Sequence, residues 1–500
     1  MSLRNTLDYF DKERASVARD LNRQQATTKT LPLELLLKIF ALLLPSGDGF
    51  MGRRNSRSSN KKDHPTADLR RTTQVCSLWR KVALESPSLW SRNLDCNKES
   101  LAWFTELLQR CQSAPVHLIA DFCQVRFLHT WYSDMADKLE MVVALSPNIG
   151  SLSMVYNGGN LREPLSNLLN IVISMSTSAT RLSFCVDMKL IPPQWRSTRH
   201  SLPSLSNQQL RQLEVEGCWP DLSLPCFGQL TWLSVSYVSE LTAKDWVQAL
   251  VGLPELKHLR LKEAMSSISA SRGFHGHIKF PNLKTLTLIG KFDDGLGEFL
   301  LAVEPTQRYS LFLHCTLVKN SNVDLLVCGL RRWLAVWNTN LPPEVGQRRI
   351  DLMASCSRFR LHNQIPGTNL SDEWFRIYFN WKSINSPERL RKIQTEIFDL
   401  FQPVLKQTHT LCIVTDGICE GFVCCPSFWQ HFQAVKILRF TSRDLGECST
   451  TAGFIKAMCN DIGMLIIHEA TFMDLMLPRI SRADYGNQAN VIPSCDIIRG

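Results

Sequence analysis

The stretch LPLELLLKIFALLL, residues Leu31–Leu44, decides how this chain is interpreted, together with VCSLWRKVALESPSLW, residues Val75–Trp90. The charged side chains of the first stretch are Glu34 and Lys38, four residues apart with the acid first, as in a favourable helical pair. Apolar residues fill the positions around them on almost every side of the predicted helix. A surface helix of a self-contained domain has one apolar stripe, so this helix is expected to bury a second face against another molecule.

The second stretch continues the helical pattern and then stops it. Apolar residues recur there at helical spacing, at Val75, Cys76, Trp79, Val82 and Ala83. Ser86-Pro87 is expected to end this helix before Leu89-Trp90, because a residue that precedes proline is disfavoured in the α conformation.

In order along the chain, the two stretches resemble an F-box. The resemblance rests on Leu31-Pro32, Glu34-Leu35-Leu36, Ile39-Phe40, Val75-Cys76, Trp79 and Leu89-Trp90. It implies a three-helix motif, with a middle helix near Asp68–Thr73, that docks on the Skp-type adaptor of a cullin–RING ubiquitin ligase. The adaptor-binding positions that it implies are Leu31, Pro32, Leu35, Leu36, Ile39, Phe40, Val75, Cys76 and Trp79. The alternative is an ordinary helical hairpin whose leucines form its own core.

A basic insert, about residues 45–68, separates the two halves of this motif, where the F-box family usually has a much shorter link. Its central part, Gly49–Pro65, lacks apolar periodicity and is expected to be a loop. Residues 46–71 hold seven Lys or Arg against three Asp, so they carry +4 of the chain's net charge of +10. The pairs Arg53-Arg54 and Lys61-Lys62 fit a bipartite nuclear signal, although a solvated loop is the favoured interpretation.

After Trp90 the chain repeats a short pattern. Leu-x-Leu-type strands are predicted at Leu182-x-Phe184, Leu213-x-Val215, Leu233-x-Val235, Leu259-x-Leu261, Leu286-x-Leu288 and Leu311-x-Leu313, with steps of 31, 20, 26, 27 and 25 residues. Leu411-x-Ile413, Leu438-x-Phe440 and Leu465-x-Ile467 continue it at steps of 27 and 27. This period resembles a degenerate leucine-rich repeat, in which a strand and a helix per repeat stack into an α/β solenoid. Separate α/β units without repeat ancestry are the alternative.

The expected organisation is therefore an N-terminal helix and linker at residues 1–30, the F-box at 31–95, an irregular leucine-rich-repeat-like solenoid at 97–480, and a loose tail at 481–500. Residues 341–407 break the period. There Ser371 is expected to cap a helix bearing Trp374, Ile377, Tyr378 and Trp381, and Ser386-Pro387 to open another that carries Leu390, Ile393, Ile397, Phe401 and Leu405.

The composition and the missing motifs restrict the function. The 17 cysteines are scattered without a Cys-x-x-Cys pair, as expected for reduced thiols packed as small apolar side chains. The chain has no secretory signal and no apolar run long enough to span a membrane, so a cytoplasmic or nuclear location is expected. No phosphate-binding loop, hydrolase elbow or zinc motif occurs, and His275 and His277 look like turn residues. No basic helix suggests nucleic-acid binding.

These observations predict a non-catalytic substrate-recognition subunit of a Skp–cullin–F-box type ubiquitin ligase, without a cofactor. The F-box would bind the adaptor and the solenoid an unknown protein client. A protein-interaction scaffold that binds the adaptor without ligase activity is the alternative, and an enzyme of unrecognised fold is disfavoured.

Overall fold

In a computed structural model the protein is a mixed α/β chain with a large, mostly parallel sheet. It divides into two compact units, Met1–Thr180 and Arg181–Gly500. The residues that the structure describes are 12–18, 20–21, 31–44, 66–92, 94–122, 129–145, 148–156, 179–186, 209–238, 240–266, 277–292, 294–306, 309–317, 323–338, 348–354, 358–364, 375–380, 387–406, 408–415, 435–442, 464–469 and 496–497.

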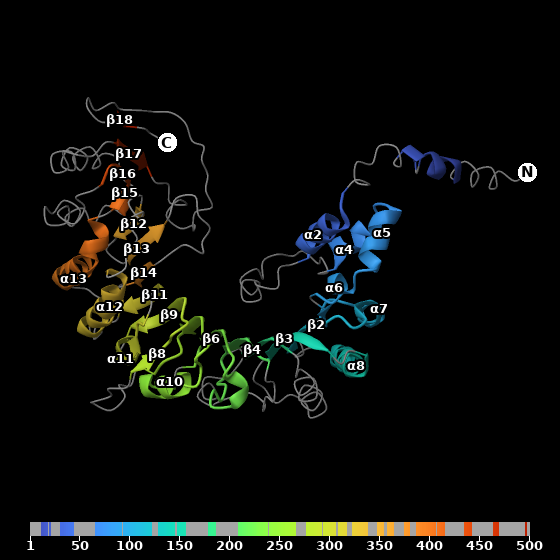
Figure 1. The fold of residues 1–500 in the computed structure, drawn as a ribbon, viewed down its shortest axis with the longest axis horizontal. Coiled ribbons are helices and arrows are strands. Elements are labelled where there is room, and N and C mark those ends of the chain that lie inside the picture. Colours follow the sequence, from blue (N-terminus) through green and yellow to red (C-terminus); the bar gives the residue numbers. More distant parts are fainter. Residues whose placement is uncertain are drawn as a thin grey trace, which may run out of the picture. The chain divides into compact units, whose positions relative to one another are not determined.

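The first unit begins with helices and continues into a parallel sheet (Figure 1). Its elements are α2 (Leu33–Leu43), α4 (Ala67–Thr72), α5 (Ser77–Leu84), α6 (Pro87–Trp90), β1 (Leu94–Asp95), α7 (Leu101–Cys111), β2 (Val116–Asp121), α8 (His129–Leu145) and β3 (Ile149–Tyr156). Residues 12–18 and 20–21 are also helical, but Val17 and Leu21 are exposed there. Helix α4 covers most of the segment Asp68–Thr73, where a helix was expected, and α6 starts at Pro87, directly after the break expected at Ser86-Pro87.

The expected domain boundary near residue 96 falls inside this first unit. Strand β1 pairs in parallel with β2, through Leu94 opposite Leu118, and β2 pairs with β3 through Leu118 opposite Leu152. The chain therefore passes from the helices α2–α6 into the sheet without a linker. The short helix α6 packs directly against α7, so the helical motif and the first strands form one packed body.

The second unit contains the remaining strands. They are β4 (Arg181–Val186), β5 (Gln212–Glu216), β6 (Trp232–Ser236), β7 (His258–Lys262), β8 (Ile278–Lys279), β9 (Thr285–Phe292), β10 (Val303–Glu304), β11 (Ser310–Leu317), β12 (Arg348–Ala354), β13 (Arg358–Gln364), β14 (Phe375–Asn380), β15 (Thr408–Thr415), β16 (Ile437–Ser442), β17 (Met464–Glu469) and β18 (Asp496–Ile497). Their order is β4-β5-β6-β7-β9-β11-β14-β13-β12-β15-β16-β17-β18, while β8 and β10 form a separate parallel pair. Strand β18 lies in the expected tail, which is thus not wholly irregular.

The leucines of the repeat pattern lie opposite one another across neighbouring strands. Leu213 pairs with Leu182 and Leu233, and the same row continues through Leu259, Leu286 and Leu311. The row of Leu411, Leu438 and Leu465 repeats this alignment in β15–β17. All nine predicted strands are confirmed. On β7, β9 and β11 buried leucines alternate with partly exposed residues, whereas on β5 and β6 the polar side chains Glu214, Ser234 and Ser236 of the other face are buried as well.

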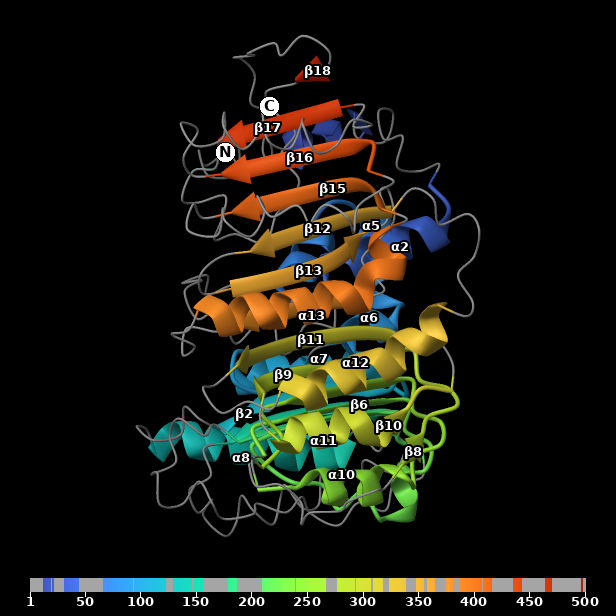
Figure 2. The same ribbon diagram turned by 90° about the vertical axis from the view of Figure 1, so that its left-hand side faces the viewer.

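Helices α10 (Ala243–Leu250), α11 (Asp294–Ala302), α12 (Val323–Asn338) and α13 (Pro387–Leu405) lie along one face of this sheet (Figures 1 and 2). Right-handed crossovers place the helices of successive parallel strands on one side. Aromatic side chains join the layers, with Trp333 of α12 at 6.3 Å from Phe375 of β14, and Phe375 at 5.1 Å from Phe401 of α13 (ring centroids). The connection between β5 and β6 contains a 3-10 helix (Pro225–Phe227), so the connections between strands differ in the kind of helix that they contain.

The break in the period is an antiparallel excursion. Strand β13 is antiparallel to both β12 and β14, while β14 is parallel to β11 and β12 is parallel to β15. The helix predicted over Trp374–Trp381 is wrong, because Phe375–Asn380 is strand β14; Ser371, Trp374 and Trp381 themselves lie outside the described residues. The helix predicted after Ser386-Pro387 is confirmed as α13, with Ile393, Ile397, Phe401 and Leu405 buried.

Two further sequence expectations concern membranes and cysteines. Within the described ranges, no helix has the length and apolar character needed to cross a bilayer. Seven of the nine cysteines whose surroundings are described are buried, which agrees with their expected packing role.

Candidate functional site: an apolar face on the N-terminal helices

The helices α2, α4 and α5 pack on one another and share a small core. Pro32 precedes α2, and its carbonyl accepts hydrogen bonds from the backbone N–H groups of Leu35 at 3.0 Å and Leu36 at 3.2 Å. Leu36 and Phe40 of α2 are buried at 1% and 0% exposure. They meet α5 through Trp79, whose ring lies 5.2 Å from that of Phe40 at an angle of 65°. One face of α2 is thus used within the motif.

The neighbouring face of α2 remains apolar and exposed. Leu35, Ile39 and Leu42 recur at intervals of four and three residues, with exposures of 44%, 38% and 84%. Val75 and Leu78, around the start of α5, are also exposed. We call these five residues, with Leu33 and Leu43 of α2, the outer apolar face.

The concentration of apolar surface in this region is unusual for the molecule. Among the described residues, twelve large apolar side chains are exposed, and eight of them lie between Leu33 and Leu84. They are Leu33, Leu35, Ile39, Leu42, Leu43, Val75, Leu78 and Leu84. Scattered apolar residues are normal on a protein surface, whereas a cluster of them marks an interaction site.

Two positions around α5 show how the sequence folds locally. Cys76 is the N-cap residue of α5, and its sulfur accepts a hydrogen bond from the backbone N–H of Trp79 at 3.4 Å. The indole Nε1 of Trp79 is buried and has no hydrogen-bond partner among the described residues. Such an orphan donor is uncommon in a folded protein, and it marks a place where another molecule can supply an acceptor.

The structure sorts the nine predicted contact residues into three groups. Pro32, Leu35, Ile39 and Val75 are exposed; Leu31, Cys76 and Trp79 are half-buried; Leu36 and Phe40 lie in the core of the helices. The last two are therefore supports of the face and not part of its surface. Sequence reasoning missed Leu33, Leu42, Leu43 and Leu78, although the nearly all-apolar character of Leu31–Leu44 was the signal that could have included them.

The basic insert enters this site at Leu44 and leaves it at Thr66. Residues 45–65, including Arg53-Arg54 and Lys61-Lys62, lie outside the described residues. Leu44 is buried at 4% exposure and Thr66 at 0%, so both ends of the insert are anchored in the helical motif. The hydroxyl of Thr66 donates to Glu99 Oε1 at 3.1 Å and accepts from the indole Nε1 of Trp103 at 3.3 Å.

An aromatic and cationic cluster attaches the helical motif to α7. The rings of Trp90 and Trp103 lie 6.4 Å apart at 81°. The guanidinium of Arg110 lies 4.7 Å from the ring centre of Trp90 and 5.0 Å from that of Trp103, and Arg70 lies 4.7 Å from Trp103. Cation–π contacts of this kind contribute about 0.5–2 kcal/mol each, depending on solvation. The motif is therefore held firmly on the first α/β element.

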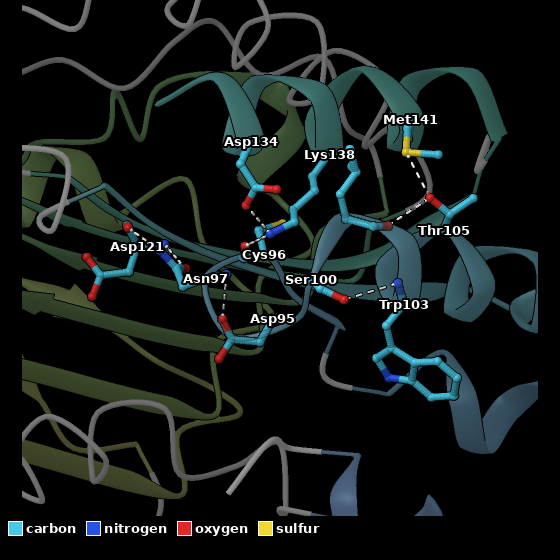
Figure 3. A network of polar contacts seen from close by, with 11 residues as sticks. Asp95, Cys96, Asn97, Ser100, Trp103, Thr105, Asp121, Asp134, Lys138 and Met141 are labelled. Carbon is cyan, nitrogen blue, oxygen red and sulfur yellow. Dashed lines mark hydrogen bonds and ion pairs between the residues drawn. The ribbon is translucent and has the colours of Figure 1, made fainter. Parts of the chain in front are cut away.

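A largely buried polar network stabilises the turn between β1 and α7 (Figure 3). The side-chain amide of Asn97 donates to the backbone oxygen of Asp121 at 2.6 Å, and its oxygen accepts from the Asp121 N–H at 2.8 Å. Lys138, exposed by 1%, donates to the backbone oxygen of Cys96 at 2.9 Å and to Asp134 at 2.5 Å. The Asn97 contacts join this turn to β2 and the Lys138–Cys96 contact joins it to α8, whereas the Lys138–Asp134 ion pair lies within α8.

Two cysteines of this unit, Cys96 and Cys111, have thiols that are poor nucleophiles. Burial raises the pKa of the Cys96 thiol above its usual range and that of Cys111 to about 12, so both stay protonated and unreactive near neutral pH. No group of three or more His, Cys, Asp or Glu that could hold a metal ion is present in the described part of the chain. The chemistry of the site is that of an apolar docking surface.

Comparison of the sequence with models of known protein families and with curated proteins gives no match.

Proposed function

We propose that this protein is a substrate-recognition subunit of a Skp–cullin–F-box type ubiquitin ligase. Helices α2, α4 and α5 bind the Skp-type adaptor through the outer apolar face, and the parallel sheet with its helices acts as a leucine-rich-repeat-like solenoid that binds a protein client. The chain forms no thioester with ubiquitin, so catalysis belongs to its partners.

The single observation that carries the proposal is the clustering of eight exposed apolar side chains between Leu33 and Leu84, on the same helices whose sequence resembles an F-box. Removing an exposed leucine from water is worth roughly 1.5–3 kcal/mol when it becomes fully buried. A partner that covers several of these residues therefore gains enough free energy for a stable complex. Leu36 and Phe40 are buried within the motif, so they hold the helices in place for this contact.

The register of the leucine rows supports the solenoid part of the proposal. Leu213, Leu233 and Leu259 lie opposite one another on three consecutive strands, as expected when each strand belongs to one repeat. Asn97 follows Leu94 by three residues and bonds to the backbone of the next strand, which is the role of a polar residue placed after a repeat strand. Uneven connections, such as the 3-10 helix between β5 and β6, make the repeats irregular.

Charge introduced at the outer apolar face tests the proposal. The variant Ile39→Lys with Leu42→Lys should fail to co-purify the Skp-type adaptor, because two uncompensated charges enter a dry interface. Both side chains are exposed, so the fold should remain intact by circular dichroism. Val251→Lys is the matched control, since Val251 is exposed by 65% in the second unit and should not affect the adaptor. Wild-type adaptor binding by the double variant would refute the F-box assignment.

The insert gives a second, independent check of the same surface. Replacing Gly49–Pro65 by a short Gly/Ser link should leave adaptor affinity unchanged, because Leu44 and Thr66 anchor its ends in the motif. A tenfold loss, equal to about 1.4 kcal/mol, would show that the insert belongs to the docking surface. Ligase and scaffold functions differ in a further readout: the level of a bound client should rise on proteasome inhibition if the complex ubiquitinates it.

A further inference from the structure

Two rows of side chains cross the face of the second unit's sheet that lies opposite the helices. Across β7, β9, β11, β14 and β13 the paired residues are Arg260, Thr287, Phe312, Arg376 and His362 in one row, and Lys262, Ile289, His314, Tyr378 and Arg360 in the other. We call them the cationic rows. They alternate along each strand with the buried leucines and aromatics that face α10–α13.

This face has partly exposed side chains at positions that are usually buried in a parallel sheet. Parallel strands are normally covered on both faces and read as continuous apolar runs. Here β7, β11 and β14 alternate strictly, with Leu259, Leu313 and Ile377 buried and Arg260, Phe312 and Tyr378 only partly buried. The helices lie along the opposite face (Figure 2). Nine of the ten residues in the cationic rows are therefore at least partly exposed on this face, whereas His362 is buried at 3% exposure.

The charge of these rows has one sign. Their ten positions include Arg260, Lys262, Arg360 and Arg376 and no aspartate or glutamate. Like charges at this spacing raise the local positive potential, which favours an anionic ligand. Carboxylates bound the field at both ends, because the same rows hold Glu214 and Glu216 on β5 and Asp351, opposite His362, on β12.

Aromatic rings hold the cations in place and add flat apolar surface. The His314 and Tyr378 rings are 4.4 Å apart and nearly perpendicular, at 78°. The Arg376 guanidinium lies 5.9 Å from the Phe312 ring centre, and Lys262 Nζ lies 4.6 Å from the ring centre of Tyr237. The Arg360 guanidinium also lies 3.2 Å from His362 Nδ1. A guanidinium carries five N–H groups and an ammonium three, so such contacts are compatible with binding a carboxylate or phosphate as well.

Unsatisfied polar atoms border the same surface. The Nε atom of Arg260 and the hydroxyls of Ser234 and Ser236 are buried and have no hydrogen-bond partner among the described residues. Both serines are exposed by only 1%, and they face Arg260 and Lys262 across the β6–β7 pair. Buried polar groups are nearly always satisfied in folded proteins, so three neighbouring orphans indicate a ligand that completes their bonds.

We propose that the cationic rows bind a short acidic segment of a protein client, with carboxylate or phosphate groups on Lys262, Arg376 and Arg360 and an apolar residue against Phe312 and Tyr378. Five strands at about 4.8 Å spacing span roughly 19 Å, which an extended segment of about six residues covers. Glu214 and Glu216 close one end, so a long polyanion such as a nucleic acid meets repulsion where a short segment does not. The proposal names the client chemistry for the proposed receptor function and rests on it.

The experiment measures binding of fluorescent peptides to the full chain by anisotropy. The probes are an Asp/Glu-rich peptide, the same peptide with Asn and Gln, a phosphoserine peptide and a single-stranded oligonucleotide. The wild-type protein should bind the acidic and phosphorylated peptides and not the amide peptide. Lys262→Glu with Arg376→Glu should weaken this binding by at least about tenfold. The control Lys244→Glu reverses an exposed charge in the first turn of α10, on the helical side, where a carboxylate is tolerated, and should bind normally.

Each outcome decides the proposal. Equal binding of the amide peptide, or normal binding by a folded Lys262→Glu/Arg376→Glu variant, would overturn it. Tighter binding of the oligonucleotide than of every acidic peptide would replace the peptide by a nucleic acid. If the double reversal unfolds, Lys262→Gln, which removes one charge, should still lower affinity measurably. The Ile39→Lys/Leu42→Lys variant should bind the peptides normally, so failure at the adaptor and failure at the cationic rows are told apart.

Discussion

The outer apolar face and the cationic rows differ in nearly every physical respect. The first is built from leucine, isoleucine and valine on helices, and the second from arginine, lysine, histidine and aromatic residues on strands. The supports differ as well: a small core around Phe40 holds the helices, whereas rows of leucines and the helices α10, α11, α12 and α13 hold the strands.

This difference predicts that the complex at the outer apolar face is longer-lived than the complex at the cationic rows. An apolar surface is unfavourable in water at all times, so it needs a constant partner, as in obligate interfaces. Partly exposed cations such as Lys262 and Arg376 keep part of their hydration without a ligand, so their partner can bind and dissociate, and its association depends on salt. A receptor that keeps one subunit and exchanges clients requires this combination.

The largest effect should come from cutting the chain between the two regions. A fragment Asn97–Gly500 lacks β1, Arg70 and Trp90, so Trp103 loses its contacts with Arg70 and Trp90, and Arg110 loses its contact with Trp90. It should aggregate or melt well below the full chain in a thermal scan, because exposed aromatic surface and an unpaired strand edge promote association.

The fragment Met1–Thr180 is the matched control for this cut. It is a compact unit and should stay folded and capture the adaptor. A fragment Asn97–Gly500 that melts like the full chain would show that the helical motif is separate from the sheet.

The next effect separates core from surface on a single helix. Phe40→Ala should lower the free energy of unfolding of the first unit by about 3–5 kcal/mol, since Phe40 is fully buried against Trp79. Leu42→Ala, at 84% exposure, should change it by less than about 0.5 kcal/mol while weakening the adaptor complex. Urea unfolding and adaptor affinity measured on both variants check this. Equal destabilisation by the two changes would mean that Leu42 is part of the core.

Salt should affect the binding affinities of the two surfaces differently. Raising NaCl from about 0.1 M to about 1 M shortens the Debye length from about 10 Å to about 3 Å. Acidic-peptide binding at the cationic rows should fall by about tenfold or more, and adaptor binding should stay constant or strengthen. Titrations of both partners in the same buffers measure the contrast. Equal salt dependence of the two would remove the distinction drawn above.

The smallest effect concerns pH. Burial and the nearby charge of Lys262 lower the pKa of His314, which also contacts the Tyr378 ring and neighbours Ile289. Without ligand, the folded state therefore binds fewer protons than the unfolded state, and stability contributed by His314 decreases as pH falls below its ordinary value of 6.5.

An acidic ligand offsets Lys262 and raises the pKa of His314, so binding takes up protons. Affinity should increase about twofold between about pH 7.5 and about pH 6, where peptide carboxylates remain ionised. The variant His314→Gln should show a flat profile over this range. An unchanged slope in that variant would assign the proton uptake elsewhere.

The strands were predictable because their signal is local. Leu213-x-Val215 or Leu259-x-Leu261 shows which residues are buried, and a parallel register follows once neighbouring strands are alike. The segment around Ile377 was misread, because aromatic and aliphatic residues there satisfy helical spacing as well as alternation. Pairing of β14 with β11 and β13 decides between the two, and such long-range partners are invisible in a local pattern.

The site was predictable in place but not in detail. The apolar excess of Leu31–Leu44 indicated a second buried face, yet it could not show that Phe40 points inward and Leu42 outward. That choice depends on the packing of α5 against α2. The cationic rows were not foreseen, since Arg260, Lys262, Arg360 and Arg376 are far apart in the sequence and meet only through strand pairing.

The excursion through β12 and β13 has a consequence for how such a sheet can lengthen. Two strands stand between β14 and β15, and the second of them, β12, points the same way as β14. A single extra strand joined by a tight turn would leave every later strand reversed, with its crossovers on the wrong side. A hairpin adds two strands, so the strand that follows it again runs in the original direction. The apolar side chains also stay on one face of the sheet, because Leu361 lies opposite both Leu352 and Ile377. Insertions that come in pairs are therefore the kind that this architecture can accept during evolution.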